Sequence, residues 1–292
     1  MNFIQGENID LKKRVKMSDL EFGQLRDFIY AQTGIYLPDN RKYLLENRLA
    51  HRLADLNLLS FGAYYDFLRY DPGRKQELNR LFDLITTKET SFFRNLPQLE
   101  LFEHVILPEL LTERKKAGEK KLRLWSAGCS TGEEPYTLAI ILDKVLGPER
   151  KEWQIEIIAN DISLNVLKLA KQGVYSSYSL RTTPPEIVQR YFKKLGNDNY
   201  QVKPELAEMV KFVQLSLNDK FKIKRLPKTQ VIFCRNVIIY FNQETKAKVI
   251  DSFYHNLSDG GYLFLGYGER IDDIDHSFKV ITYPESVVYQ KK

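Results

Sequence analysis

The sequence predicts an α/β fold: a mostly parallel sheet covered by helices on both faces, with an all-helical region before it and a small antiparallel insertion within it. Three observations support this. Helical periodicity runs through the first part of the chain, strand and helix patterns alternate from Leu122 onward, and residues 174–210 break that alternation. Alternation of this kind is typical of a parallel sheet with crossover helices.

The length and the composition indicate a globular protein. A length of 292 residues suffices for one large domain or two modest ones. A composition of 43% hydrophobic and 28% charged residues is typical of a globular protein. No apolar run approaches the roughly 18 residues of a membrane span, and the first residues lack the pattern of a signal peptide. Cys129 and Cys234 cannot form a disulfide framework. A soluble cytoplasmic protein without membrane insertion is expected.

The net charge of +6 favours an acidic partner but does not identify a nucleic acid. The four histidines show no ligand spacing with either cysteine, so no metal site is expected. No interface motif is visible, and a monomer is expected.

The first part of the chain is expected to be helical. Residues 1–17 lack sustained periodicity and are predicted to form a flexible arm. Residues 18–87 contain four amphipathic helical patterns, which predict a small helical domain. Ser18 and Glu21 have the spacing of a capping box at the start of the first helix.

The second helix, near residues 40–57, carries a basic stripe made of Arg41, Arg48 and Arg52. We expect this stripe to be exposed beside a leucine face. It could dock an acidic helical partner, or it could be an ordinary solvated surface, which is the commoner role of charged runs.

Residues 88–121 are predicted to be a linker followed by one long helix at 97–116. The linker begins within Thr86–Asn95, a stretch rich in hydroxyl groups that also contains Phe92, Phe93 and Arg94. The two phenylalanines could belong to the core or to a site.

The sheet is predicted from Leu122 to the end of the chain. Helices are expected at 134–146, 163–172 and 243–257, and strands at 122–126, 155–161, 211–217, 229–234, 262–266 and 286–290. The interruption at about 174–210 predicts an inserted helix with short antiparallel strands. Long interruptions in compact folds are often functional.

A strand, a tight loop and a helix start follow one another within Leu122–Ala139. The loop has Gly128 and Gly132 but lacks the third glycine of a dinucleotide fingerprint. Glu133 and Glu134 would repel a pyrophosphate, so a positively charged ligand such as S-adenosylmethionine fits better. The alternative is a purely structural turn.

Polar residues also follow two other predicted strands, at the edge where a parallel sheet binds ligands. Asp161 could hold a ribose diol, or it could cap the next helix. Arg235 and Asn236 follow an apolar strand and would be costly to bury unpaired, so they are expected to face either a polar ligand or each other's backbone. Cys234 is expected to be a core residue rather than a nucleophile.

Three motifs together resemble the chemotaxis receptor methyltransferase (CheR) family. They are Thr90–Arg94 (TSFFR), Trp125–Tyr136 (WSAGCSTGEEPY) and Phe233–Phe241 (FCRNVIIYF). The resemblance covers nearly the whole chain after residue 17. It implies an N-terminal all-helical domain at 18–87 and a Rossmann-like S-adenosylmethionine-dependent methyltransferase domain at 122–292.

The resemblance further implies methyl transfer from S-adenosylmethionine to glutamate carboxylates in the helical cytoplasmic region of chemoreceptors, with S-adenosylhomocysteine as product. Arg94 and Tyr240 are implied to act at the methyl group. The positions implied to contact the cofactor are Lys88, Thr90, Arg94, Ala127, Glu133, Asp161, Ser216, Leu217, Arg235 and Asn236.

Two of these positions depart from the family pattern. Lys88 replaces a usual asparagine, and Ser216-Leu217 replaces a usual Asn-Leu pair, so contacts near the adenine are expected to differ. Three other functions stay open: a methyltransferase with another acceptor such as RNA, a non-catalytic scaffold, and a nicotinamide oxidoreductase, which the missing glycine disfavours. In some family members the insertion grips a receptor tail, and the sequence does not decide whether this one does.

Overall fold

The computed structural model describes residues 15–271, 274 and 277–292. The chain divides into two compact units. The helical unit contains residues 1–31 and 36–86, and the sheet unit contains residues 32–35 and 87–292. Most of the predicted arm lies outside the described residues. Met17, at its end, is buried, and its amide donates a hydrogen bond to Glu46 Oε2 at 2.9 Å, so this residue is part of the packed structure.

The four predicted helices of this region are present as α1 (Asp19–Thr33), α2 (Lys42–Asp55), α3 (Phe61–Tyr70) and α4 (Arg74–Ile85), and a short 3-10 helix that was not predicted, η1 (Asp39–Arg41), precedes α2. The capping box is confirmed, because the Ser18 amide donates to Glu21 Oε2 at 2.8 Å and the Glu21 amide donates to Ser18 Oγ at 3.2 Å. The apolar stripes are buried at Leu25, Leu45, Leu49, Leu53, Phe61, Leu68 and Leu81.

The basic stripe is only partly exposed. Arg41 is exposed, whereas Arg48 is half-buried and donates from Nη1 to the Ile85 carbonyl at 2.6 Å. The prediction that Arg52 is exposed is wrong: this residue is 9% exposed. Its guanidinium donates to both Glu77 oxygens, at 2.9 and 2.7 Å, since α4 places that carboxylate against α2. Two parallel bonds of this kind hold an arginine in place.

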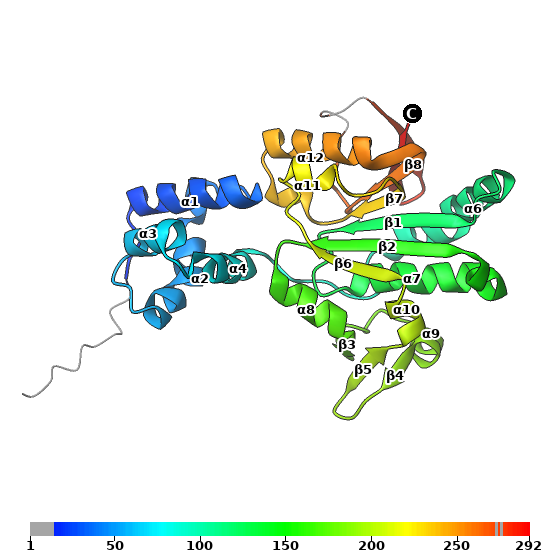
Figure 1. Ribbon diagram of the computed structural model, residues 1–292, viewed down its shortest axis with the longest axis horizontal. Helices are drawn as coiled ribbons and strands as arrows, with labels where there is room; N and C mark the ends of the chain where they lie inside the picture. Colours follow the sequence, from blue (N-terminus) through cyan, green and yellow to red (C-terminus); the bar gives the residue numbers. More distant parts are fainter. Residues whose placement is uncertain (1–14, 272–273, 275–276) are drawn as a thin grey trace, which may run out of the picture. The chain divides into compact units, whose positions relative to one another are not determined.

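The sheet unit is built on seven strands: β1 (Lys121–Ala127), β2 (Gln154–Asp161), β6 (Val210–Gln214), β7 (Thr229–Cys234), β8 (Leu257–Leu265), β9 (Phe278–Tyr283) and β10 (Ser286–Lys291). Their order is β6-β2-β1-β7-β8-β10-β9, and Figure 1 labels the first five of them. The first five are parallel and the last two pairings are antiparallel. The predicted parallel core is confirmed. The carboxyl ends of β6, β2, β1 and β7 therefore meet at one edge.

Strand β9 was not predicted. It is an edge strand whose residues are mostly exposed or half-buried, so its apolar alternation is weak. The last strands carry an antiparallel hairpin at the end of the parallel core.

The helices of the sheet unit are α5 (Leu96–Leu101), η2 (Phe102–Ile106), α6 (Leu107–Lys116), α7 (Glu133–Leu146), η3 (Gly147–Glu152), α8 (Leu164–Gln172), α11 (Lys220–Ile223), η4 (Ile238–Tyr240) and α12 (Gln243–Asn256). The predicted long helix at 97–116 is interrupted by the π-helical segment η2. Pro108 has no amide to donate to the His104 carbonyl, which breaks the regular helical ladder at this place.

Alternate strand residues pack into two cores, as period two requires. Leu122 and Leu124 of β1 join the core that contains α7 and the α5–α6 segment. Trp125 and Ala127 join the opposite core, against α12. The helices thus cover both faces of the sheet (Figure 1).

The insertion is confirmed as a helix with short antiparallel strands (Figure 1). It contains β3 (Val174–Ser176), α9 (Pro185–Tyr191), β4 (Phe192–Lys194), β5 (Asn199–Val202) and α10 (Pro204–Ala207), and its sheet order is β3-β5-β4. Phe92 connects the insertion to the segment that precedes α5. The Phe92 amide donates to the Ser179 carbonyl at 3.0 Å, and the Thr182 hydroxyl donates to the Phe92 carbonyl at 2.5 Å.

Candidate active site

The loop after β1 follows a backbone path that requires glycine. Gly128 has φ +77°, and a Cβ there would lie 2.6 Å from Val237 Cγ2 in the segment after β7. The Gly128 and Cys129 amides donate to the Asn160 carbonyl at 2.9 and 2.8 Å. The loop therefore lies close to both neighbouring strands at the carboxyl edge.

Asn160 fixes this edge from within the core. Its Oδ1 accepts from Trp125 Nε1 at 2.7 Å, and its Nδ2 donates to the Leu215 carbonyl at 2.9 Å. One buried amide thus joins β1, β2 and the segment after β6. The sequence analysis did not single out Asn160; its only signal is a polar residue near the end of an apolar strand.

Asp161, the last residue of β2, braces the loop after β1. Its Oδ2 accepts from the Ser130 amide at 3.0 Å and its Oδ1 accepts from the Ser163 amide at 2.9 Å. The alternative in which Asp161 caps α8 is wrong, because Ser163 is the cap and its Oγ accepts from the Val166 amide at 3.4 Å. Asp161 is half-buried, at the position where a ribose diol is held in related sheets.

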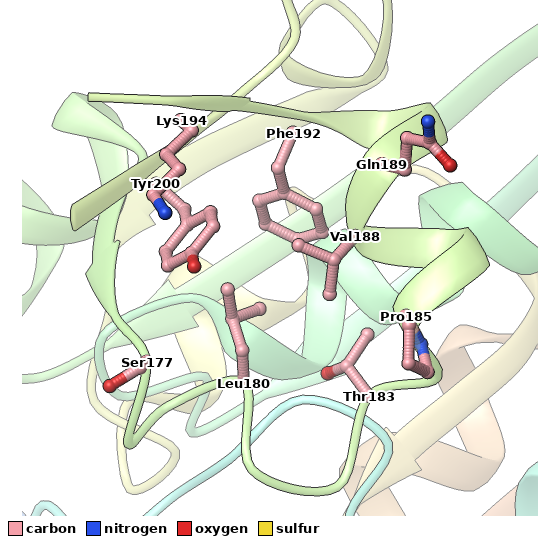
Figure 2. A pocket seen from close by; sticks show the side chains of 9 residues that line it. All are labelled: Ser177, Leu180, Thr183, Pro185, Val188, Gln189, Phe192, Lys194 and Tyr200. Carbon is pink, nitrogen blue, oxygen red and sulfur yellow. The ribbon is translucent and has the colours of Figure 1, made fainter. Parts of the chain in front are cut away.

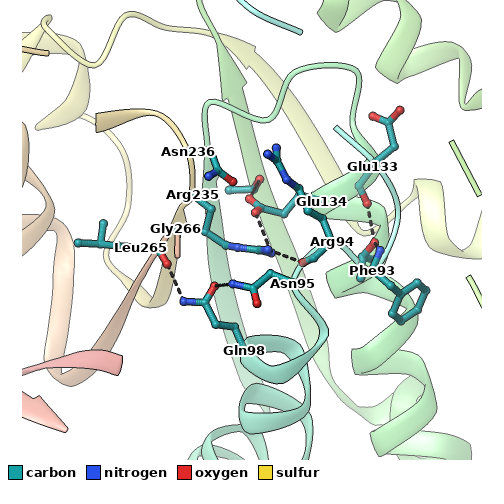
Figure 3. Close-up of polar contacts among 12 residues, drawn as sticks. Phe93, Arg94, Asn95, Gln98, Glu133, Glu134, Arg235, Asn236, Leu265 and Gly266 are labelled. Carbon is teal, nitrogen blue, oxygen red and sulfur yellow. Dashed lines mark hydrogen bonds and ion pairs between the residues drawn. The ribbon is translucent and has the colours of Figure 1, made fainter. Parts of the chain in front are cut away.

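A buried charged cluster lies where β1 and β7 end. The Arg235 side chain is 4% exposed and that of Glu134 is 16% exposed, with 3.4 Å between Nη1 and Oε2. Nη2 also donates to the Arg94 carbonyl (Figure 3). Ser126 Oγ donates to Glu134 Oε1 at 2.7 Å. Arg235 Nε is buried and has no hydrogen-bond partner in the described part of the chain.

Burial opposes both charges of this pair. Burial raises the pKa of Glu134, although Arg235, Ser126 and Arg94 act in the other direction. Burial lowers the pKa of Arg235, and the nearby Arg94 adds to that decrease. A buried guanidinium with one unsatisfied N–H is suited to a ligand that brings an acceptor.

Glu133 and Glu134 have different surroundings. Glu133 accepts from Thr131 Oγ1 at 2.6 Å and from Ser179 Oγ at 3.2 Å. Its carboxylate points away from Arg235 (Figure 3). The sequence analysis selected Glu133 as a cofactor contact, whereas the structure brings Glu134 into the cluster with Arg235. The two adjacent residues could not be separated from the sequence, because both begin the same helix.

The Thr90–Arg94 motif reaches the same cluster through a strained turn. Phe93 and Asn95 have φ of 52° and 60°, a left-handed conformation that is uncommon outside glycine and often occurs at functional sites. The Phe93 amide donates to Thr137 Oγ1 at 3.2 Å. Gln98 accepts from Asn95 at 3.0 Å and donates to a carbonyl of β8 at 2.7 Å (Figure 3). These bonds hold the Arg94 backbone beside β7.

The other predicted cofactor positions belong to the same unit. Ala127 and Leu217 are buried in the core, and Thr90 and Ser216 are half-buried. Lys88 is exposed, and its carbonyl accepts from Ser130 Oγ at 3.2 Å. Ala127 ends β1 and Ser216 follows β6, while the bond to Ser130 connects Lys88 to the loop after β1.

The segment after β7 carries Asn236 and Tyr240. Asn236 has φ 59°, and Tyr240 ends η4 with 37% of its surface exposed. Glu269, which the sequence analysis missed, is 6% exposed beneath this segment. It accepts from the Asn236 and Ile239 amides at 2.9 and 3.2 Å. Backbone donors leave no signal in the side-chain pattern, so this contact could not be predicted.

The residues of the edge fit S-adenosylmethionine by their chemistry. The buried Arg235 with its unsatisfied Nε suits a carboxylate, and the Glu134 carboxylate suits an ammonium group. Asp161 suits a pair of ribose hydroxyls. S-adenosylmethionine carries a carboxylate, an ammonium group and a ribose diol, so each of these three side chains would have a partner on it.

A separate pocket lies in the insertion (Figure 2). Leu180, Val188 and Phe192 give it an apolar wall, and Lys194 and Tyr200 add polar groups. No residue of the predicted cofactor site lines it.

Two absences hold for residues 15–271, 274 and 277–292. There, no group of three or more His, Cys, Asp and Glu side chains is arranged to hold a metal ion. Among the helices of those residues, none combines the length and apolar character of a membrane span. Cys129 and Cys234 are free and buried, and burial raises the pKa of both thiols, which confirms Cys234 as a core residue.

Comparison with known families agrees with the motifs. Residues 88–287 match the model described as CheR methyltransferase, SAM binding domain, and residues 20–86 match CheR methyltransferase, all-alpha domain. The chain is 34% identical over 277 residues to chemotaxis protein methyltransferase 2 of Vibrio cholerae, covering 95% of this chain and 94% of that protein. It is 36% identical over 252 residues to the chemotaxis protein methyltransferase of Borreliella burgdorferi (86% and 88%) and 34% identical over 275 residues to that of Escherichia coli (92% and 91%).

Proposed function

Because the chain belongs to the CheR methyltransferase family, we propose that it esterifies glutamate side chains of chemoreceptors at the edge formed by β1, β2, β6 and β7. It is an S-adenosylmethionine-dependent methyltransferase, and S-adenosylhomocysteine is the product. The observation that carries the assignment of the site is the buried cluster of Arg235, Glu134 and the Arg94 backbone.

Arg235 and Glu134 would hold the charged methionine end of the cofactor, and Asp161 would hold its ribose. Lys88, Ser216 and Leu217 are the positions assigned to the adenine side. Thr90, Ala127, Glu133 and Asn236 complete the set taken from the family motifs. When bound, S-adenosylmethionine supplies an electrophilic methyl group on a sulfonium centre.

The acceptor needs no general base. A glutamate carboxylate has a pKa of about 4.3 and is already ionised at neutral pH. One of its oxygens would take the methyl group that bound S-adenosylmethionine supplies, so that the products would be a glutamate methyl ester and S-adenosylhomocysteine. Catalysis then consists mainly of holding the carboxylate in line and removing its water.

Arg94 and Tyr240 are proposed to do this positioning. The Arg94 backbone is fixed by Arg235, and its own guanidinium donates to the Glu89 carbonyl at 3.0 Å while its side chain is half-buried. Tyr240, the last residue of η4, is partly exposed to solvent. A cation and a phenol hydroxyl can both donate to a carboxylate.

In the helical unit, Arg41 and Arg48 are proposed to contact an acidic face of the receptor's helical cytoplasmic region. Arg52 is left out because its guanidinium is buried against Glu77. The enzyme is proposed to be cytoplasmic and monomeric.

Transfer of labelled methyl groups from S-adenosylmethionine to membranes that contain chemoreceptors tests the proposal. The expected result is label on receptor glutamates that alkali releases, because carboxylate esters are base-labile. Arg94→Ala and Tyr240→Phe should each lower kcat, while Arg41→Glu should raise KM for the receptor. Label on generic RNA, lost steeply as salt rises, would indicate a nucleic-acid acceptor instead.

A further inference from the structure

Glu269 is a buried carboxylate with no role in the assignments above. It closes the turn that follows β8, where its amide donates to the Gly266 carbonyl at 2.9 Å. The residue is 6% exposed. A carboxylate is costly to bury unless donors satisfy it, so its partners identify what it stabilises.

Those partners are three backbone amides. Oε2 accepts from Gly266 at 2.6 Å and from Asn236 at 2.9 Å, and Oε1 accepts from Ile239 at 3.2 Å. One amide belongs to the turn of Glu269 itself. The other two belong to the segment that connects β7 to Tyr240. The carboxylate therefore ties the turn after β8 to the segment after β7.

The tied segment has an unusual conformation and an outward-facing end. Asn236 is left-handed, with φ 59°. Ile238 is buried in the core, whereas Ile239 and Tyr240 are 56% and 37% exposed. The segment is thus held from the protein side by Ile238 and Glu269, and it presents the next two side chains to the outside.

Gly266 makes room for this arrangement. A Cβ at residue 266 would lie 2.6 Å from Glu269 Oε2 and 2.7 Å from the Asn236 amide nitrogen. The glycine allows the carboxylate and the Asn236 backbone to approach each other.

We propose that Glu269 is a positioning residue for methyl transfer, which fixes residues 236–240 so that Tyr240 meets the acceptor carboxylate in the productive geometry. Glu269 itself touches neither substrate nor cofactor. The inference rests on the proposed role of Tyr240, because a fixed turn matters to the reaction only if that side chain takes part in it.

Glu269→Gln is the direct test. The substitution replaces one acceptor oxygen by an NH₂ group, which must face a backbone N–H. We expect kcat to fall roughly 10- to 100-fold, as for a small misplacement of a reacting group, with the receptor KM changed less than about threefold. The S-adenosylmethionine Kd should rise by a smaller factor than kcat falls, because Asn236 of the same segment is assigned to the cofactor. The control is Glu244→Gln, which alters an exposed carboxylate paired with Lys248 and should leave all three values unchanged.

The double variant with Tyr240→Phe separates positioning from general stability. If Glu269 acts through Tyr240, Glu269→Gln should cost much less in the Tyr240→Phe background than alone. An equal loss in both backgrounds would overturn the inference. A normal kcat for Tyr240→Phe would refute the proposed role of Tyr240 and this inference with it, whereas a slow Tyr240→Phe beside a normal Glu269→Gln would refute only the role of Glu269.

Gly266→Ala covers the case in which Glu269→Gln does not fold. This variant keeps the carboxylate but displaces it from the Asn236 amide, and the same loss of kcat is expected. A folded Gly266→Ala enzyme with a normal kcat would overturn the inference.

Discussion

Substitution of Arg52 by methionine should destabilise the helical unit severely. Arg52→Met deletes both bonds to Glu77 and leaves that buried carboxylate with the Tyr64 hydroxyl at 2.9 Å and the Arg80 guanidinium at 3.9 Å. Removal of one partner of a buried ion pair costs about 3–5 kcal/mol. The exposed Arg80 can move closer, so we expect about 3 kcal/mol. For a domain of this size the melting temperature then falls by roughly 12–24 °C.

The measurement is thermal and urea unfolding of the full chain, followed by circular dichroism at 222 nm. The two units can unfold separately, so each transition is fitted on its own. Arg52→Lys should be intermediate, since one ammonium cannot reproduce two parallel bonds. Arg41→Met is the matched control on the same stripe: it should leave the transition in place, because Arg41 is exposed.

The burial of Arg52 and the exposure of Arg41 should also separate the two residues in receptor kinetics. Arg52→Lys, at a temperature where it is folded, should methylate receptors normally, whereas Arg41→Glu should raise the receptor KM. If Arg52→Met left the helical unit as stable as the wild type and abolished receptor methylation, Arg52 would be a docking residue. The assignment of its guanidinium to the core would then be refuted.

Three further predictions concern the sheet unit. Gly128→Ala places a Cβ 2.6 Å from Val237 at φ +77°, so calorimetry should find both a lower melting temperature and weaker binding of S-adenosylmethionine. Asp161→Asn sets an NH₂ group against the Ser130 amide, and titration calorimetry should find the cofactor affinity reduced roughly 10- to 100-fold, the value of one charged hydrogen bond. Burial raises the folded pKa of Glu134 above its ordinary 4.5, so the folded state holds that proton more tightly. The contribution of Glu134 to the free energy of unfolding therefore decreases as pH rises from about 4.5 through the folded pKa, and in urea unfolding Glu134→Gln should remove that part of the pH dependence.

Much of the fold could be predicted because local signals and tertiary packing agree. Strand β7 was predicted at the residues where it occurs, since all six of its residues are buried and form an apolar run. The capping box was predicted because both of its bonds form within one turn. Strand β9 and the π-helical segment were missed, because an edge strand has little alternation and a leucine-rich helix keeps its pattern across a π turn.

The site was predictable to the extent that strand ends define it. Asp161 and Arg235 could be placed at one edge because parallel strands bring their carboxyl ends together. The burial of Arg52 could not be predicted, since its partner Glu77 is on another helix. The same limit applies to Glu269, whose partners are amides of a distant segment and carry no side-chain signature.

Phe92 makes the insertion an integral part of the enzyme rather than a removable module. Its ring packs edge-on against Tyr175 and Phe192 of the insertion, with centroids 4.8 and 5.1 Å apart. Arg94 lies two residues further along the chain. A deletion of residues 174–210 would therefore remove the aromatic contacts of Phe92, which hold the segment that carries Arg94. Length changes should be better tolerated at the exposed tip between β4 and β5, because an insertion there would leave the contacts of Phe92 in place.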